Sequence, residues 1–392
     1  MDYSRLLSRR AAEMRPSGIR KFFDIAAEMD DCISLGVGEP DFKTPWAIRE
    51  AGITSLERGR TRYTSNIGLK ELRSEVCHYL HRRMELSYQP DQVMITVGGS
   101  EAIDLCIRAL VDPGDEVILP EPCYVSYQPI TTLTGGVPVS VPLKAENGFR
   151  LTAAELKAAI TPKTKLLVLP FPCNPTGAVM RREHLEEIAE VLRGTSITVL
   201  SDEIYAELTY GYDRHVSIAS LEGMAERTVV INGFSKAYAM TGWRLGFACG
   251  PKALIDTMVK IHQSCIMCAP TTSQYAAVTA LRDCDEQIEE MRTQYDMRRR
   301  YLVKCLNEMG LTCFEPEGAF YVFPCIRSTG MTSDEFAQHL LYEKRVAVVP
   351  GTAFGDCGEG FVRISYAYSV EHLQEARKRI RAFLKEKGLL HE

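Results

Sequence analysis

Short apolar runs alternate with helical patterns between about residues 90 and 250 of this chain. The runs are Val93 to Val97, Glu116 to Leu119, Lys165 to Leu169, Ile197 to Leu200, Thr228 to Ile231 and Leu245 to Cys249. Because they are short, nearly continuous and rich in β-branched residues, they are typical of strands buried on both faces. The alternation predicts an α/β fold, in which helices cover both faces of a mostly parallel sheet.

Two of the intervening segments have clear helical periodicity. Apolar residues recur every three or four positions from Leu69 to Met84 and again from Ser100 to Val111. We expect both segments to be amphipathic helices. The second of them directly follows the strand that ends near Val97.

The pattern changes after Asp285. A long charged helical stretch, Gln287 to Met309, is followed by an apolar run, Gly318 to Phe323. Another helix comes next, then a strand at Arg345 to Val349 and a last helix from Val370. This order is typical of a smaller α+β domain. We therefore expect an N-terminal arm with part of the small domain, a large domain and a small C-terminal domain, at residues 1–44, 45–285 and 286–392.

Composition narrows the class of protein. The chain has 392 residues, 45% of them hydrophobic, and a formal net charge of -5 without a basic stripe, which disfavours nucleic acid as a partner. No segment approaches the ~20 apolar residues of a membrane span. Thirteen cysteines are scattered through the expected helices and strands, as in a cytoplasmic protein with reduced thiols. Cys265 and Cys268 have metal-like spacing, but without a second pair a packed helix face is the better interpretation than a zinc site.

The most informative segment runs from Asn232 to Tyr238. It follows the expected strand Thr228 to Ile231 and presents Lys236 at the carboxyl edge of that strand, with Arg244 eight residues further on. Desolvation disfavours the ammonium form, so such an amine can form a Schiff base with an aldehyde cofactor. Pyridoxal phosphate is the obvious candidate, although a lone lysine is more often a solvated surface group.

Three other turns follow expected strands. The turn Gly98 to Ala102 opens a helix whose first N–H groups can hold a phosphate, and a tight strand-to-helix turn is the alternative. Asn174 lies between two prolines and can donate from its amide, although Asn-Pro turns are usually structural. Asp202, three residues before Tyr205, needs a cationic partner such as a pyridinium nitrogen if it is buried; otherwise it is a helix N-cap.

The common location of these four segments strengthens the case that they form one binding site. In open α/β sheets, ligands bind at the carboxyl ends of the strands. All four segments fall at such ends, and together they offer partners for a phosphate, a ring nitrogen, a ring oxygen and an aldehyde. This combination indicates a pyridoxal phosphate site, and no metal ligand set is expected.

Over essentially its whole length the chain resembles the class I aminotransferases of fold type I, and the bacterial aromatic or N-acetyl-diaminopimelate aminotransferase-like subgroup looks nearest. The resemblance depends on ordered motifs, which are Gly36 to Phe42, Tyr63 to Gly68, Asn174 to Gly177, Ser201 to Tyr205, Asn232 to Gly246 and Phe361 to Ser365. It implies a large domain with a mostly parallel sheet and a smaller α+β domain, which agrees with the apolar pattern.

The resemblance also implies roles for the turn residues. Lys236 would form the Schiff base with pyridoxal phosphate and then move a proton between the substrate α-carbon and the cofactor. Asp202 would pair with the pyridinium nitrogen, while Asn174 and Tyr205 would hydrogen-bond the phenolic oxygen of the ring. Tyr124 would stack on the ring face; without the resemblance, it is more simply a packing residue.

The same resemblance implies a phosphate site shared between two subunits. Backbone groups of Gly99, Ser100 and Glu101 would bind the phosphate. The guanidinium of Arg244 would bind it too. Tyr63 would reach this phosphate from the other subunit, so the functional unit would be a homodimer.

Two further contacts follow from the resemblance. Some relatives have a phosphate-binding serine three residues before the lysine; this chain has Gly233 there, so Ser235 is the candidate contact. Arg363 would bind the substrate α-carboxylate bidentately, aided by the Gly38 backbone N–H and by Asn174. Without the resemblance, Arg363 reads as a solvated strand arginine.

The expected activity is ping-pong transfer of an amino group from an L-amino acid to a 2-oxo acid such as 2-oxoglutarate. A carbon–sulfur β-lyase on the same fold is the alternative. The effector-sensing part of a regulator is disfavoured, because the site residues are retained and no DNA-binding extension is evident. An apolar N-terminal run that includes Ile19, Phe22 and Phe23 favours aromatic or long aliphatic donors, with aspartate, alanine and an acylated diamino acid still open.

Overall fold

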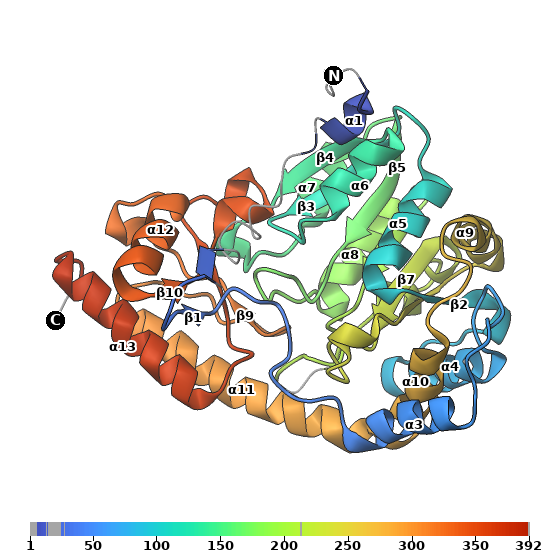
Figure 1. Ribbon diagram of the computed structural model, residues 1–392. Helices are drawn as coiled ribbons and strands as arrows, with labels where there is room; N and C mark the ends of the chain where they lie inside the picture. The colour runs from blue at the N-terminus through green and yellow to red at the C-terminus, as the bar shows by residue number, and fades with distance from the viewer. Residues whose placement is uncertain (1–5, 13, 15–24, 27, 212–213, 391–392) are drawn as a thin grey trace.

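The computed structural model describes residues 6–12, 14, 25–26, 28–211 and 214–390. Its centre is a seven-stranded sheet with the strand order β2-β8-β7-β6-β5-β3-β4 (Figure 1). The strands are β2 (Val93–Thr96), β3 (Glu116–Glu121), β4 (Val137–Pro142), β5 (Thr164–Leu169), β6 (Thr198–Asp202), β7 (Thr228–Gly233) and β8 (Gly246–Cys249). Neighbouring strands from β4 to β7 pair in parallel, whereas β8 is antiparallel to both β2 and β7. The predicted α/β fold with a mostly parallel sheet is confirmed.

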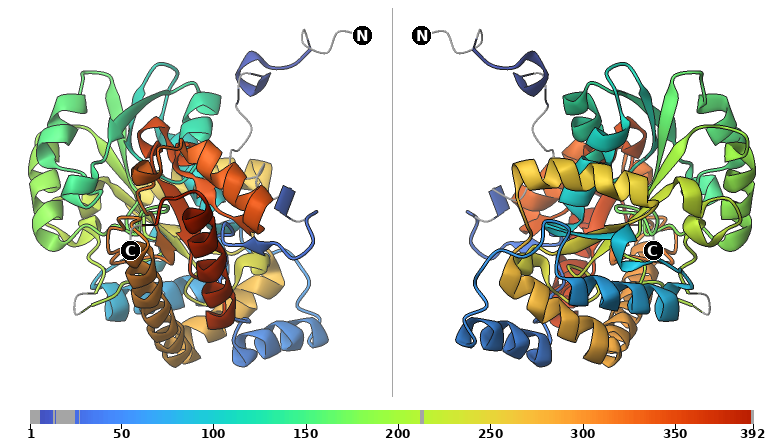
Figure 2. Two further views of the ribbon diagram at one scale, coloured as in Figure 1. Left: turned by 90° about the vertical axis from the view of Figure 1, so that its left-hand side faces the viewer. Right: turned by 90° about the vertical axis from the view of Figure 1, so that its right-hand side faces the viewer.

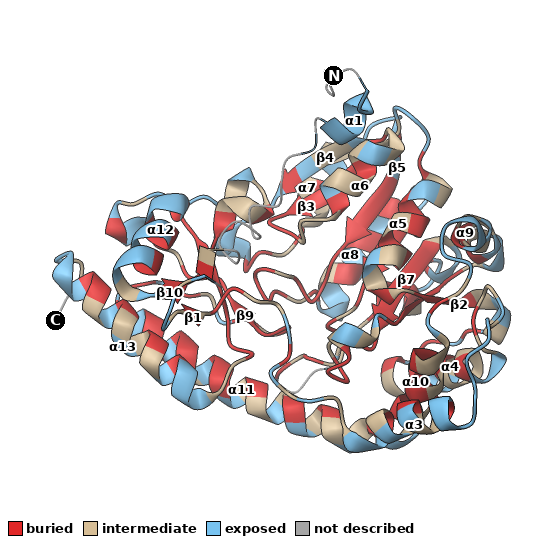
Figure 3. Ribbon diagram, in the orientation of Figure 1, coloured by how far each residue is buried: buried red, intermediate tan, exposed pale blue. Residues whose placement is uncertain are grey.

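Helices cover both faces of this sheet, as the side views in Figure 2 show. Along β5, Leu166 and Val168 face one layer of helices and Leu167 and Leu169 face the other, as the two-residue period of a strand requires. The first layer consists of α5 (Gly98–Leu110), α6 (Tyr127–Thr134) and α9 (Lys252–Cys265). The second consists of α4 (Lys70–Met84), α7 (Ala153–Ala159), α8 (Arg182–Leu192) and α10 (Thr271–Asp283). The central strands are buried between these layers (Figure 3).

The C-terminal part forms a second core beside the large sheet (Figure 1). A small antiparallel sheet has the order β11-β12-β9, with β9 (Tyr321–Val322), β11 (Val349–Pro350) and β12 (Val362–Ser365). Its helices are α11 (Asp285–Glu308), α12 (Ser333–Lys344) and α13 (Val370–Glu386). Strand β1 (Ile33–Ser34) pairs in parallel with β10 (Val346–Ala347), and α3 (Trp46–Glu57) follows in the chain. The boundaries at 44/45 and 285/286 stay a prediction.

Three details differ from the sequence-based expectations. The single strand expected at Arg345 to Val349 is divided into β10 and β11, because the two short strands pair with different partners, β1 and β12. It begins one residue later than expected, because Arg345 has a positive φ and ends α12. Strand β4 was not predicted; it is an edge strand with two prolines, a type of strand that lacks a continuous apolar run. Cys265 ends α9 and is exposed, so the predicted packed face is wrong there.

The parallel order of the sheet explains where a site can form. The carboxyl ends of β5, β6 and β7 meet at one edge, and α5 begins close to that edge after β2. Within the described part of the chain, every helix is too short or too polar to cross a bilayer. No cluster of His, Cys, Asp or Glu side chains in that same part is arranged to hold a metal ion.

Candidate active site

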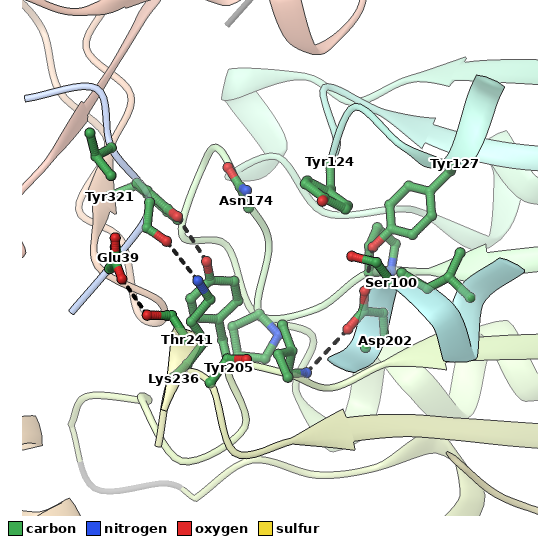
Figure 4. Close-up of a pocket in the computed structure, with 18 of the residues that line it drawn as sticks. Glu39, Ser100, Tyr124, Tyr127, Asn174, Asp202, Tyr205, Lys236, Thr241 and Tyr321 are labelled. Atoms are coloured by element: carbon green, nitrogen blue, oxygen red, sulfur yellow. Dashed lines mark hydrogen bonds between the residues drawn. The ribbon is translucent and has the colours of Figure 1, made fainter. Parts of the chain in front are cut away.

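A cavity of about 510 Å³ lies at this edge of the large sheet and is closed on its other side by residues from the small sheet and from the N-terminal segment (Figure 4). Most of the predicted site residues line it; these are Gly38, Gly99, Ser100, Tyr124, Asn174, Asp202, Tyr205, Ser235, Lys236, Arg244 and Arg363. Glu101 and Tyr63 are not among its lining residues. Residues more than 300 positions apart in sequence therefore meet in one place.

Lys236 extends into the cavity from the turn after β7. Its Nζ atom donates a hydrogen bond to the carbonyl oxygen of Gly38 at 2.6 Å. Burial lowers the pKa of this amine to about 8; Glu39 opposes the shift, and the positive charge of Arg363 adds to it. About a tenth of the amine is therefore neutral and nucleophilic at pH 7, far more than for an ordinary lysine, and this is the form that Schiff-base formation requires.

Asp202 ends β6 and is buried at the base of the cavity. Its Oδ2 atom accepts a hydrogen bond from the hydroxyl of Tyr127 at 2.7 Å, and its Oδ1 atom accepts one from the backbone N–H of Ile204 at 3.2 Å (Figure 4). Burial raises the pKa of the carboxyl to about 6 in spite of these bonds. A buried carboxylate that forms no ion pair with a described residue can take a cationic ring nitrogen as its partner.

Arg363 is fully enclosed on β12, so its interpretation as a solvated strand arginine is wrong. One terminal nitrogen donates to Oδ1 of Asn174 at 2.8 Å and the other donates to the carbonyl oxygen of Gly36. The guanidinium carbon lies 4.4 Å from the ring centroid of Tyr321. None of these partners is anionic, so this buried cation can bind a carboxylate that enters the cavity.

The start of α5 and Arg244 form the third charged part of the cavity. Gly98 has a φ of +78°, and a Cβ atom there would lie 2.8 Å from a terminal nitrogen of Arg244, so the turn requires glycine. The first N–H groups of a helix have no partners within the helix. With the guanidinium beside them, they suit a phosphate. Ser235 is buried and lines the same cavity.

The remaining predicted residues do not place a side chain in the cavity of this chain, or lie outside the described residues. The side chain of Glu101 accepts from the backbone N–H of Val97 at 2.5 Å, so only its backbone is available for an anion. Tyr63 is 80% exposed, away from the cavity of its own chain. Ile19, Phe22 and Phe23, expected near the donor side chain, lie outside the described residues.

Two tyrosines that line the cavity were missed by sequence reasoning. Tyr127 holds Asp202, and Tyr321 forms a hydrogen bond of 2.8 Å with the hydroxyl of Tyr205 (Figure 4). A Cβ atom at Gly38 would collide with the Tyr321 hydroxyl, so only glycine allows the N-terminal segment to approach this closely. In the sequence, the only indication of a role for Tyr321 was its position in the apolar run Gly318 to Phe323.

Comparison with known proteins agrees with this chemistry. A sequence model of the family described as aminotransferase class I and II matches residues 30–380. YugH of Bacillus subtilis is 55% identical over 379 residues, which cover 96% of this chain and 98% of that protein. The aspartate aminotransferase of Pyrococcus abyssi is 49% identical over 98% of this chain and 99% of its own length. The crystal structure of an aromatic aminotransferase from Pyrococcus horikoshii is 47% identical, with a TM-score of 0.90, over 95% of this chain and 100% of that one.

Proposed function

Because the chain belongs to the aminotransferase class I and II family, whose members use pyridoxal phosphate, we propose that it moves an amino group from a neutral L-amino acid, aromatic or long aliphatic, to a 2-oxo acid such as 2-oxoglutarate. The observation that carries this proposal is the convergence of Lys236, Asp202 and Arg363 on one cavity. These three residues supply an amine for the aldehyde, a carboxylate for the ring nitrogen and a cation for the substrate.

The residues present fit pyridoxal phosphate. The enclosed carboxylate of Asp202 lacks a cationic partner among the described residues, and the start of α5 lines the cavity together with Arg244, so an anion in the cavity can meet both. Tyr124 lines the cavity and offers a ring face, and Asn174 keeps its amide N–H groups available as donors. When bound, the cofactor supplies an electron sink for bond breaking at the substrate α-carbon.

Lys236 is the proposed acid and base of the reaction. Its amine, with a pKa lowered to about 8, can take a proton from the substrate α-carbon and return it. Tyr205 and Tyr321 are joined by a hydrogen bond at the side of the cavity, and Tyr205 would hold the ring hydroxyl. Arg363 and Asn174 would fix the substrate carboxylate, so that positioning contributes to the rate.

The lining of the cavity supports a neutral donor. Among the described lining residues, the cations are Lys236, Arg244 and Arg363, and each already has a proposed partner. A donor with a second carboxylate would need a cation that none of these described lining residues supplies. About half of the other lining residues are aromatic or apolar, with Ile103 and Ile204 among them, which supports aromatic and long aliphatic side chains.

The proposal is tested by visible spectroscopy of the purified holoenzyme with single L-amino acids and no oxo acid. We expect the band of the lysine-bound cofactor to convert to that of the amine form with phenylalanine, tyrosine or leucine, and far less with aspartate. Faster conversion with aspartate would contradict the substrate class. Release of ammonia and pyruvate from a donor with a β-substituent, without conversion, would instead indicate a β-lyase.

Replacing Arg363 with lysine is expected to lower kcat/KM for amino acids about a hundredfold, mostly through KM, because lysine keeps the charge but loses the planar fork. Initial rates with an amino acid and with its decarboxylated amine separate the roles. The amine has no carboxylate, so its slower conversion should change little.

Arg327 provides the matched control for that substitution. It is exposed, its guanidinium stacks on the ring of Phe361 at 5.0 Å, and it lies outside the cavity. The Arg327→Lys variant should keep the kinetics of the unmodified enzyme. An equal loss with amine and amino acid in Arg363→Lys would reject the carboxylate role.

We also propose that the functional unit is a cytoplasmic homodimer in which Tyr63 reaches the phosphate of the partner's site. The exposure of Tyr63 supports this, as do nearby exposed apolar residues on α3, namely Trp46, Ile53 and Leu56. All thirteen cysteines lie in the described part of the chain and are free thiols, which supports a reducing compartment. Sedimentation of the holoenzyme as a monomer would contradict the shared site.

A further inference from the structure

His262 is completely buried near the end of α9 and does not line the cavity. Its Nδ1 atom lies 2.7 Å from Oε1 of Glu101, a residue 161 positions away in sequence. The side chain of His262 is 0% exposed and that of Glu101 is 12% exposed. An ionised carboxylate only accepts hydrogen bonds, so Nδ1 carries the proton and donates it to Glu101.

Glu101 transmits this contact to the start of α5. Its other oxygen, Oε2, accepts from the backbone N–H of Val97 at 2.5 Å. The side chain thereby bridges the turn that contains Gly98, with its φ of +78°, and ties the last residue before the helix to the first turn. This is the turn whose N–H groups we propose as the phosphate cradle.

The position of the Glu101 carboxylate affects phosphate binding, because both groups are negatively charged. A carboxylate in the first turn of a helix interacts with the same positive helix end as a bound phosphate. Hydrogen bonds from His262 and Val97 occupy one oxygen each, and the carboxylate that they hold does not line the cavity. Without the histidine, the carboxylate is free to turn toward the phosphate, which it repels.

We infer that His262 is a positioning residue for the cofactor phosphate, acting through Glu101 on the first turn of α5. The inference rests on the proposed function, since it takes the phosphate to bind at Gly99 to Glu101. His262 lies on α9, outside the cavity lining. Its replacement should change the affinity for the phosphate group and not for the rest of the cofactor.

The test compares pyridoxal phosphate with pyridoxal, which lacks the phosphate. Dissociation constants for both are measured by absorbance titration of the cofactor-free protein. The affinity ratio, which is the dissociation constant of pyridoxal divided by that of pyridoxal phosphate, isolates the phosphate contribution. In His262→Leu we expect this ratio to fall about tenfold, the equivalent of one charge-assisted hydrogen bond. His262→Asn, whose amide N–H replaces Nδ1–H, should recover most of the ratio. An unchanged ratio in His262→Leu would overturn the inference.

His215 supplies the matched control. Its side chain is 8% exposed, and its Nε2 atom lies 3.0 Å from Oε2 of Glu203, a glutamate that follows β6 and is not part of α5. His215→Leu should lower thermal stability and leave the affinity ratio unchanged. An equal fall of the ratio in this variant would show that any buried histidine loss has the same effect, and would also overturn the inference.

A double-mutant cycle tests the route through Glu101. If His262 acts only on that carboxylate, Glu101→Ala and the double variant should have the same ratio, and additive losses would reject the route. If His262→Leu does not fold, the cycle is made with His262→Asn in its place, and Glu101→Ala still reports on the pair. A wild-type protein that binds pyridoxal and its phosphate equally would instead contradict the proposed phosphate site itself.

Discussion

Replacing Lys236 with alanine is expected to lower transamination by about 10⁴-fold, because one side chain provides both the covalent attachment and the proton transfer. The cavity contains no second amine among its described lining residues. Stopped-flow absorbance of the half-reaction with the best amino donor measures the loss. The variant should still take up pyridoxal phosphate, since Asp202 and Arg244 remain, but without the shifted absorbance of a lysine adduct.

Two further measurements sharpen this expectation. The amine has a pKa lowered to about 8 by burial. Only its neutral form attacks an aldehyde, so capture of pyridoxal phosphate by the cofactor-free protein should accelerate as the pH rises through about 8 and then level off. Lys43→Ala, a change at an exposed lysine near the N-terminal segment, is the control and should react normally. Turnover close to that of the unmodified enzyme in Lys236→Ala would remove the central assignment.

The sequence was sufficient for the residues whose position follows from a strand. Lys236, Asp202 and Asn174 come directly after apolar runs, and parallel strands bring such residues to one edge, so their meeting could be predicted. The same reasoning recovered most of the sheet, including the antiparallel β8 as a strand, though not its direction. Family resemblance then supplied the roles, which the strand pattern alone left open.

Other features depend on packing that no local pattern records. Tyr127 lies on a helix, and its contact with Asp202 depends on how α6 packs against the sheet. Arg363 alternates with apolar neighbours like a surface residue, but the N-terminal segment covers it and accepts a hydrogen bond through Gly36. The contact between His262 and Glu101 joins two helices from different parts of the chain, so only the fold reveals it.

Asp202 illustrates a conflict between stability and function. Its carboxylate accepts hydrogen bonds only from the neutral donors Tyr127 and Ile204 among the described residues, and burial raises its pKa from 3.8 to about 6. The folded cofactor-free protein therefore binds this proton more tightly than the unfolded chain does. Its free energy of unfolding should fall as the pH rises from about 4 to about 6 and stay low above that range. A bound pyridinium would supply the missing positive charge.

Replacing Asp202 with asparagine should therefore have opposite effects on the two properties. Asparagine can keep hydrogen bonds to Tyr127 and Ile204 without a buried charge, so the cofactor-free variant should be more stable at pH 8 by roughly 1–3 kcal/mol. Transamination should fall by about 10³-fold, because nothing would keep the ring nitrogen protonated and the electron sink weakens. Denaturant unfolding and half-reaction rates measure the two effects.

The decisive comparison is how much pyridoxal phosphate stabilises each protein. In the unmodified enzyme, the ring nitrogen offsets the cost of the buried carboxylate, so adding cofactor should raise the free energy of unfolding more than it does in Asp202→Asn. Asp104→Asn, a change at a residue of α5 that pairs with Arg108 at 2.8 Å outside the cavity, should behave like the unmodified enzyme. Equal stabilisation of the unmodified enzyme and Asp202→Asn would mean that the ring nitrogen does not lie against this carboxylate, and the proposed placement of the cofactor ring would be wrong.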